Sequence, residues 1–194
     1  MIKDWLLRAK YSNYNFVKST IDKVVETLPL DNISQKSTRG NNSKQYTILE
    51  EKIDLIINDY SYFLNNLPQL KEKLNGKKLK FLSSWLVCGN EGSYHTLHQH
   101  NPSTDGGDSF TNTFNIATVL YLDVPKHNST DSFDLEGDMY FMTLRDGYIK
   151  KNVITPEEGD FIIMPTYLWH GVYPQKKGLR RTLNMDFEVV DYEN

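Results

Sequence analysis

Apolar residues recur at helical spacing in two stretches near the start of the chain. The first predicts an amphipathic helix over residues 14–28, which Pro29 would end. Its apolar positions are Phe16, Ile21, Val24, Val25 and Leu28. A second helix is predicted over residues 48–64, where isoleucine, leucine and aromatic residues keep the same spacing, and Pro68 would end or interrupt it. The polar stretch 32–46 has almost nothing to bury and is predicted as a loop.

Beyond Gly76 the helical spacing gives way to short runs of β-branched and aromatic residues, separated by Gly, Asn, Pro and Asp. The predicted strands cover residues 80–87, 113–124, 139–143, 160–165 and 179–190. Many short strands without helices between them are typical of a sandwich or barrel. We therefore predict a mainly β protein with one domain over 1–194, in which 1–76 is a helical flank packed on one side and 77–194 is the β core.

The composition of the chain gives no support for a nucleic-acid or membrane partner. The net charge of -3 gives no support for binding nucleic acid, which normally requires a basic excess. The longest apolar runs are too short to cross a bilayer, and the first residues carry no apolar signal core. Cys88 is the single cysteine, so no intrachain disulfide forms, and we expect it to be a buried strand residue. These features favour a cytoplasmic protein with no membrane partner.

Histidines cluster in two segments, residues 94–102 and 159–170. Imidazole is the commonest protein ligand for transition metals. In a strand His98 and His100 point to the same face, and His170 on a distant strand could complete a three-point metal site with open positions for substrate or dioxygen. A hydrogen-bonded core histidine is the alternative for His170. In a regular strand His95 lies on the face opposite His98, as a second-layer or substrate-rim residue, and His127 is expected to be solvated.

A strand after His170 alternates between polar and apolar residues. The polar positions are Arg180, Thr182, Asn184 and Asp186, and the apolar positions are Leu183, Met185 and Phe187. If the polar face looks into a barrel, Arg180 is a buried guanidinium that needs an anion, and a carboxylate matches its fork of donors. Thr182 could add a hydroxyl hydrogen bond. Solvation of Arg180 and Arg181 at the start of the strand is the alternative, and the pattern leaves open which of the two arginines binds the anion.

These residues resemble the 2-oxoglutarate- and Fe(II)-dependent oxygenases, specifically a group of small, often phage or bacterial, proteins with a His-X-His segment. The first part of the shared motif is carried by Trp85, Gly92, Tyr94, His98, His100 and Pro102. A strand ending at Tyr121, Leu122 and Pro125 follows, and the motif closes at Gly159, Pro165, His170, Arg180 and Thr182. The resemblance covers residues 79–190.

The resemblance implies a double-stranded β-helix, a jelly-roll or cupin-like barrel with iron at its open end. It implies that His98, His100 and His170 hold Fe(II), and that Arg180, Thr182 and Tyr121 bind the distal carboxylate of 2-oxoglutarate. The implied reaction uses O₂, converts 2-oxoglutarate to succinate and CO₂, and hydroxylates an unidentified substrate. Most of the superfamily has Asp or Glu where His100 stands; Asp105 or Asp108 could supply a carboxylate instead.

Two other functions fit parts of the pattern. A cupin-type dioxygenase or isomerase with three histidines would explain residues 92–100 and 159–170, but not Arg180 and Thr182. A noncatalytic barrel that binds a small ligand would use the same cavity. The primary substrate stays open among a peptide prolyl side chain, a free amino acid and a nucleoside, and so does the oligomeric state, with a homodimer as one alternative. Leu168, Trp169 and the loop 101–112 are candidates for excluding water.

Overall fold

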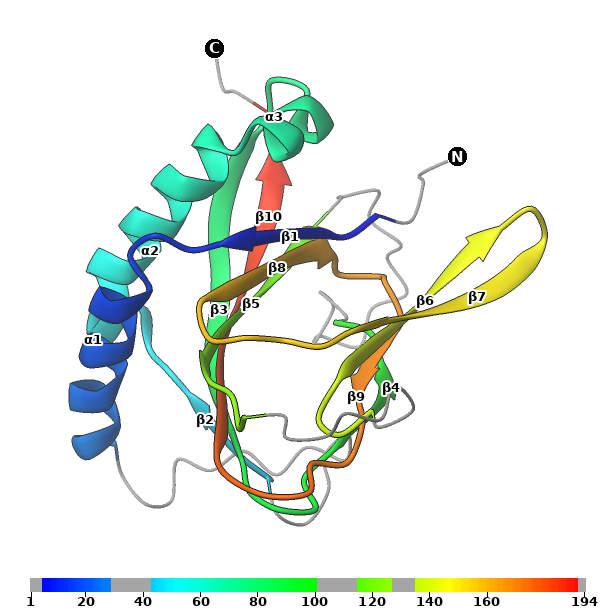
Figure 1. The fold of residues 1–194 in the computed structure, drawn as a ribbon. Coiled ribbons are helices and arrows are strands. Elements are labelled where there is room, and N and C mark those ends of the chain that lie inside the picture. Colours follow the sequence, from blue (N-terminus) through cyan, green and yellow to red (C-terminus); the bar gives the residue numbers. More distant parts are fainter. Residues whose placement is uncertain (1–4, 29–42, 101–114, 127–134, 192–194) are drawn as a thin grey trace, which may run out of the picture.

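The computed structural model describes residues 5–28, 43–100, 115–126 and 135–191. Strands dominate these residues, and the helices gather on one side of the molecule (Figure 1). The helices are α1 (Tyr14–Glu26), α2 (Glu50–Asn66) and α3 (Pro68–Leu74). The strands are β1 (Leu7–Lys10), β2 (Ser43–Thr47), β3 (Lys78–Gly89), β4 (His95–His98), β5 (Asn115–Asp123), β6 (Met139–Arg145), β7 (Tyr148–Ile154), β8 (Asp160–Pro165), β9 (His170–Val172) and β10 (Arg180–Val190).

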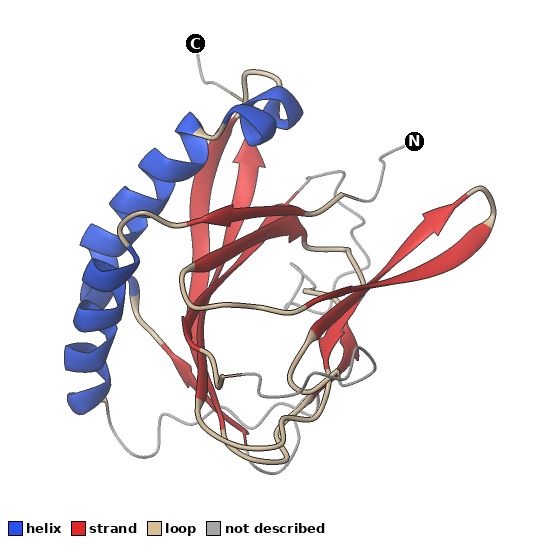
Figure 2. Ribbon diagram, viewed as in Figure 1, coloured by secondary structure: helices blue, strands red, loops and turns tan. Residues whose placement is uncertain are grey.

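The strands form two antiparallel sheets. The larger has the order β1-β8-β5-β10-β3-β2, and the smaller has the order β4-β9-β6-β7. From β3 onward the chain passes back and forth between the two sheets, which is the connectivity of a jelly roll. The predicted double-stranded β-helix with helices on one side is confirmed (Figure 2).

The larger sheet buries apolar side chains on both of its faces. Its outer face packs against α1 and α2, where Ile21 and Tyr60 meet Leu183 and Phe187 in one core cluster. Its inner face contributes residues such as Ile162 to a second cluster inside the barrel. Strands β5 and β8 are therefore buried along nearly their whole length, which explains why their sequences read as continuous apolar runs.

The N-terminal region is more than the predicted helical flank. Strand β1 pairs with β8 and β2 pairs with β3, so residues before 77 form both edges of the larger sheet. Residues 43–46 were predicted as loop, and this prediction is wrong, because an edge strand needs backbone pairing on one side and tolerates polar side chains. Strand β7 was not predicted, because its mostly exposed residues lack apolar alternation. Pro68 ends the second predicted helix and begins α3, where its missing amide hydrogen is not needed.

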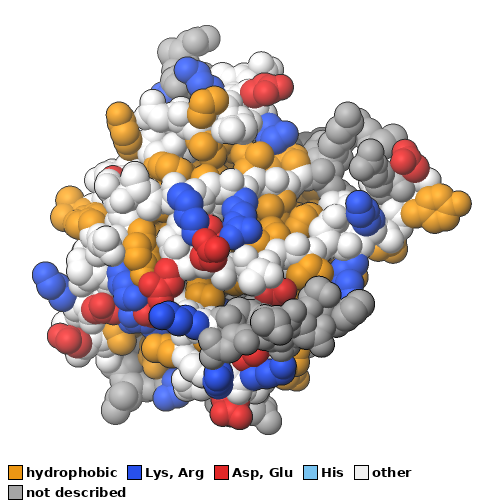
Figure 3. Space-filling model, viewed as in Figure 1, with side chains coloured by type: hydrophobic (Ala, Val, Ile, Leu, Met, Phe, Trp, Pro, Cys, Tyr) orange, Lys and Arg blue, Asp and Glu red, His pale blue; other side chains and the backbone are white. Residues whose placement is uncertain are grey.

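The surface carries no large single-sign patch on the face drawn in Figure 3, where basic and acidic side chains of the described residues are mixed. Hydrophobic side chains stand out at the tip of the hairpin formed by β6 and β7, with Leu144, Tyr148 and Ile149 all largely exposed. Among the described residues, no helix is both long and apolar enough to cross a membrane.

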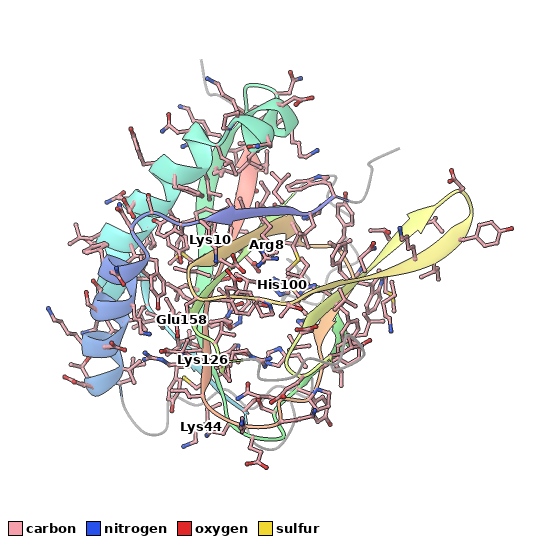
Figure 4. The ribbon with its side chains drawn as sticks, in the orientation of Figure 1. Arg8, Lys10, Lys44, His100, Lys126 and Glu158 are labelled. Atoms are coloured by element: carbon pink, nitrogen blue, oxygen red, sulfur yellow. The ribbon has the colours of Figure 1, made fainter. Side chains whose placement is uncertain are left out.

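A buried carboxylate fixes β1 to the start of β8. Asp160 is almost inaccessible, and its oxygens lie 2.6 Å from the Arg8 guanidinium and 2.9 Å from Lys10 Nζ, both on β1 (Figure 4). Burial acts to raise the pKa of Asp160, but the hydrogen bonds from Arg8, Lys10 and the Glu157 amide outweigh it and hold the pKa below the usual 3.8. The folded state therefore favours ionised Asp160.

We expect this carboxylate to link stability to pH. Because its pKa is lower in the folded protein, its contribution is fully present above the unfolded pKa and is lost as the pH falls through the folded pKa. Asp160→Asn should lower the free energy of unfolding at pH 7 by on the order of 1–3 kcal/mol, and the difference from wild type should shrink below about pH 4. Denaturant titrations across this range measure both effects. The control is Glu157→Gln, an exposed partner of Lys10 that should change stability by less than about 1 kcal/mol; an equal loss would contradict the account.

Candidate metal centre

Three histidines from two distant parts of the chain converge inside the barrel. One ring nitrogen from each of His98, His100 and His170 lies within 4.8 Å of those of the other two. His98 and His170 stand directly opposite each other where β4 pairs with β9. His100 follows the end of β4, where its backbone N–H donates to the Thr166 carbonyl at 2.9 Å, and its side chain lies between the two sheets (Figure 4).

The hydrogen bonds of the three rings select the nitrogen that is left for a metal. Nδ1 of His98 lies 2.8 Å from the Thr96 carbonyl oxygen, and Nδ1 of His170 lies 2.8 Å from that of Leu168. Nδ1 of His100 lies 2.9 Å from an Asp186 carboxylate oxygen. Each Nδ1–H thus has an acceptor, which leaves Nε2 with its lone pair as the ligand atom, the arrangement typical of metal-bound histidines.

The electrostatics favour a neutral His170 ring. Burial, helped by the neighbouring His100 and His98, lowers the pKa of His170 well below its usual 6.5. A neutral imidazole is the form that binds a metal. Three imidazole donors on one side of a cavity suit a first-row transition metal with positions left for other ligands, so the residues present fit an iron centre.

His95 lies in the same cavity, so the expectation that it faces away from His98 is wrong. The pairing register of β4 with β9 shifts between His95 and His98, which breaks the regular alternation. The ring centroids of the two residues are 5.9 Å apart. The backbone of His95 and the ring of Tyr140 pack closely against Gly171. A Cβ at this position would lie 2.5 Å from the Tyr140 ring and 2.9 Å from the His95 carbonyl oxygen, so glycine is needed here.

The histidines line one side of a cavity of about 370 Å³. The polar face of β10 supplies another side, and Tyr121 of β5 and Trp85 of β3 also reach it. The residues of β10 that line it are Arg180, Thr182, Asn184 and Asp186, which is the set predicted from the alternation. The cavity is large enough for a small dicarboxylate together with part of a second molecule.

Arg180 and Arg181 have different environments. Arg180 is buried in the cavity wall, and the only polar partner that the described residues give its guanidinium is the Gly137 carbonyl oxygen, 3.3 Å from Nη1. Burial lowers its pKa below the usual value for arginine, and the nearby Tyr121 partly opposes this effect. Arg181 points to the other face of the sheet and pairs with Asp123 and Asp22. Arg180 is thus the arginine that is placed to take an anion from the cavity.

Thr182 and Tyr121 flank Arg180 in the cavity wall. The Thr182 hydroxyl oxygen accepts a hydrogen bond from Asn184 Nδ2 at 3.2 Å, which leaves its own hydrogen available. Tyr121 is buried, and burial raises its pKa to about 12, while Arg180 acts in the opposite direction. Its hydroxyl is therefore protonated at neutral pH and can act as a donor.

The other residues singled out in the sequence lie partly within and partly outside the described part of the chain. Leu168 is buried in the barrel cluster, and the adjacent Trp169 is 47% exposed. Cys88 is partly buried in β3, and burial raises the pKa of its thiol to about 11, which indicates an unreactive strand residue. His127, Asp105, Asp108 and the loop 101–112 lie outside the described residues.

Sequence reasoning missed the contact between Asp186 and His100. Asp186 was recognised as one of the polar positions of its strand, but nothing in the sequence connects it with a residue 86 positions earlier. The edge-to-face contact of Trp85 with His100, with ring centroids 5.1 Å apart, was also missed. Both contacts depend on how β10, β3 and the end of β4 come together.

Comparisons with known proteins agree with this geometry. Residues 83–186, more than half of the chain, match a protein family described as "Putative 2OG-Fe(II) oxygenase". A viral collagen prolyl hydroxylase from Paramecium Bursaria Chlorella virus-1, solved with 2OG, is similar at 18% identity, with 96% of this chain and 97% of that chain covered and a TM-score of 0.62. A Pseudomonas putida prolyl-4-hydroxylase is similar at 14% identity, with coverage of 97% and 93% and a TM-score of 0.58. HygX from Streptomyces hygroscopicus, solved with nickel and 2-oxoglutarate, is similar at 11% identity, with coverage of 95% and 83% and a TM-score of 0.61. No curated protein sequence matched the chain.

The geometry predicts that the three histidines bind a transition metal as a unit. Replacing His98, His100 or His170 with Ala should weaken Co(II) binding by about 100-fold or more, since each supplies a ligand atom and outer partners alone are worth about 10–100-fold. Anaerobic titration followed by the visible Co(II) spectrum measures this. The control is His95→Ala, which lies outside the group of three and should cost less than about tenfold. Equal losses for His95 and His98 would contradict the assignment.

Proposed function

The chain belongs to the 2-oxoglutarate- and Fe(II)-dependent oxygenase family, and we propose that the cavity lined by the three histidines holds Fe(II) and 2-oxoglutarate side by side. The proposed iron ligands are His98, His100 and His170. The proposed partners of the distal carboxylate of 2-oxoglutarate are Arg180, Thr182 and Tyr121. The observation that carries this proposal is the convergence of three histidines in the same cavity as a buried arginine that has no carboxylate partner among the described residues.

Family membership makes the protein an enzyme with Fe(II) as its cofactor and 2-oxoglutarate and O₂ as co-substrates. When bound, the iron supplies the oxidative chemistry that converts 2-oxoglutarate to succinate and CO₂ and hydroxylates a substrate that is not identified. The protein's own residues bind and orient the reactants and exclude water. Two earlier alternatives give way to this function. The family match includes Arg180 and Thr182, which a cupin-type site does not explain, and it supports an enzyme over a noncatalytic barrel.

Arg180 would fix the orientation of 2-oxoglutarate. A carboxylate in the cavity can accept two parallel hydrogen bonds from a guanidinium, and burial strengthens this pairing relative to water. The hydroxyls of Thr182 and Tyr121 can donate to the same carboxylate. This arrangement directs the keto acid end of the molecule toward the histidines. The cost of burying Arg180 without a charged partner supports the assignment, since the bound co-substrate would remove it.

The substrate would approach from the part of the cavity lined by Gln45, Thr47 and Trp85. These residues offer neutral hydrogen-bonding groups and an aromatic face. Of the three substrate classes, we propose a prolyl side chain as the first to test, because two of the similar structures are prolyl hydroxylases. Neither of the two residues before His170 lines the cavity: Trp169 is half exposed, and Leu168 belongs to the apolar interior.

One anaerobic titration tests both halves of this proposal. Addition of 2-oxoglutarate to the Fe(II)-loaded protein should produce a visible metal-to-ligand charge-transfer band, which reports chelation of the iron by the keto acid. Arg180→Ala should raise the apparent dissociation constant read from this band by about tenfold or more, the cost of losing a charged hydrogen-bonded pair.

Arg181→Ala is the matched control for that titration. It removes the same charge from the adjacent residue, whose partners Asp123 and Asp22 lie on the far side of the sheet. The dissociation constant should change less than about twofold. The absence of a band with iron bound would contradict the family chemistry for this chain, and a larger effect of Arg181→Ala would contradict the assignment of Arg180.

A further inference from the structure

Asp186 lies directly behind one of the three histidines. Its carboxylate oxygen is 2.9 Å from Nδ1 of His100, and the side chains are only 15% and 10% exposed. Nδ1 and Nε2 lie on opposite sides of an imidazole ring, so a carboxylate that holds Nδ1 sits behind the ring rather than among the metal ligands. Asp186 is accordingly outside the group of three converging ligand atoms, although it lines the same cavity.

The three histidines differ in what holds them. His98 and His170 each rest on a backbone carbonyl oxygen, which is neutral, whereas His100 rests on a carboxylate. A site with two histidines and one carboxylate contributes one negative charge to Fe(II), but three neutral histidines contribute none. A carboxylate hydrogen-bonded to a ligand histidine increases the electron density on the ring and makes it a stronger ligand. By the resemblance to the superfamily, His100 stands where most members have Asp or Glu.

We propose that Asp186 is a positioning residue that supplies the metal centre, through His100, with the negative charge that its three histidines lack. This inference rests on the proposed function, since it requires that His100 binds the metal. Other members of the superfamily place a carboxylate directly on the iron. Here the Asp186 carboxylate would take over its electrostatic role, with the His100 ring between the carboxylate and the metal.

The surroundings of Asp186 favour this role over a purely structural one. In the described part of the chain its carboxylate has no lysine or arginine partner, and the His100 ring is its one polar contact. By contrast, Asp160, a buried carboxylate elsewhere in the barrel, is paired with two cations. A buried carboxylate without a cation is costly, and a metal ion bound to His100 would offset that cost. Trp85 packs edge-on against His100, so the ring is oriented from two sides.

Metal affinity tests the proposal without turnover. Asp186→Asn keeps the size of the side chain and an oxygen that can accept the hydrogen bond, but it removes the charge. The dissociation constant for Co(II), measured by anaerobic titration, should rise about 10- to 100-fold. Glu188→Gln is the matched control, because it makes the same change two residues along β10 at a position that does not line the cavity. It should leave the constant unchanged within about twofold.

A double-mutant cycle separates an effect through His100 from a general effect on the fold. If Asp186 acts through His100, Asp186→Asn should cause no further loss of Co(II) affinity in a His100→Ala background. Asp186→Glu keeps the charge and should bind Co(II) more tightly than Asp186→Asn, which provides a second comparison should the asparagine variant fold poorly.

Three results would overturn the proposal. They are an unchanged Co(II) affinity in Asp186→Asn, an equal loss in the presence and absence of His100, and a glutamate variant that binds no better than the asparagine variant. A wild-type protein that binds no Co(II) would instead overturn the metal site itself, and the role of Asp186 with it. If this inference alone is wrong, the wild-type protein will bind Co(II) tightly and give the 2-oxoglutarate charge-transfer band. Substitution of Asp186 will then leave the Co(II) affinity unchanged.

Discussion

The alternation of side chains along β10 is the constraint on which the rest of the molecule depends. The strand lies in the larger sheet between β5 and β3 and pairs with both. Its odd-numbered residues face the helices, where Leu183 and Phe187 enter the outer core, and its even-numbered residues from Arg180 to Asp186 face the cavity. A slip of one residue would bury apolar groups in the site and expose the arginine. The two pairing partners make such a slip unfavourable.

This arrangement explains why the protein needs its helices. The inner face of β10 is polar and adds nothing to a hydrophobic core, so the apolar contacts of this strand come from its outer face, which packs against the helices. Each fully buried leucine or phenylalanine on the outer face contributes about 1.5–3 kcal/mol. That contribution offsets the cost of holding Arg180 in the interior without a charged partner among the described residues, a cost on the order of several kcal/mol. Apolar packing on the outer face of β10 thus compensates for the unfavourable burial of a charged arginine on its inner face.

Sequence patterns predicted the parts of the fold that are strongly two-sided or fully buried. The predicted bounds of β8 agree with the structure, and those of β10 differ by one residue, because their apolar positions are continuous or strictly alternating. Edge strands β1, β2 and β7 were missed, since backbone pairing rather than side-chain burial defines them. At the site, alternation placed Arg180 on the polar face but left open which of the two arginines takes the anion; the contacts in the structure distinguish them. The position of His95 and the contact of Asp186 with His100 could not be predicted, because a register shift and the meeting of distant strands determine them.

A crystal structure grown anaerobically with Mn(II) and 2-oxoglutarate tests the central claim most directly. Mn(II) has the charge of Fe(II) and does not drive the reaction. The crystal should therefore hold the metal ion and intact 2-oxoglutarate. The account predicts the metal bound by Nε2 of His98, His100 and His170, with the distal carboxylate of 2-oxoglutarate on Arg180. A metal bound elsewhere, or 2-oxoglutarate bound away from Arg180, would contradict it.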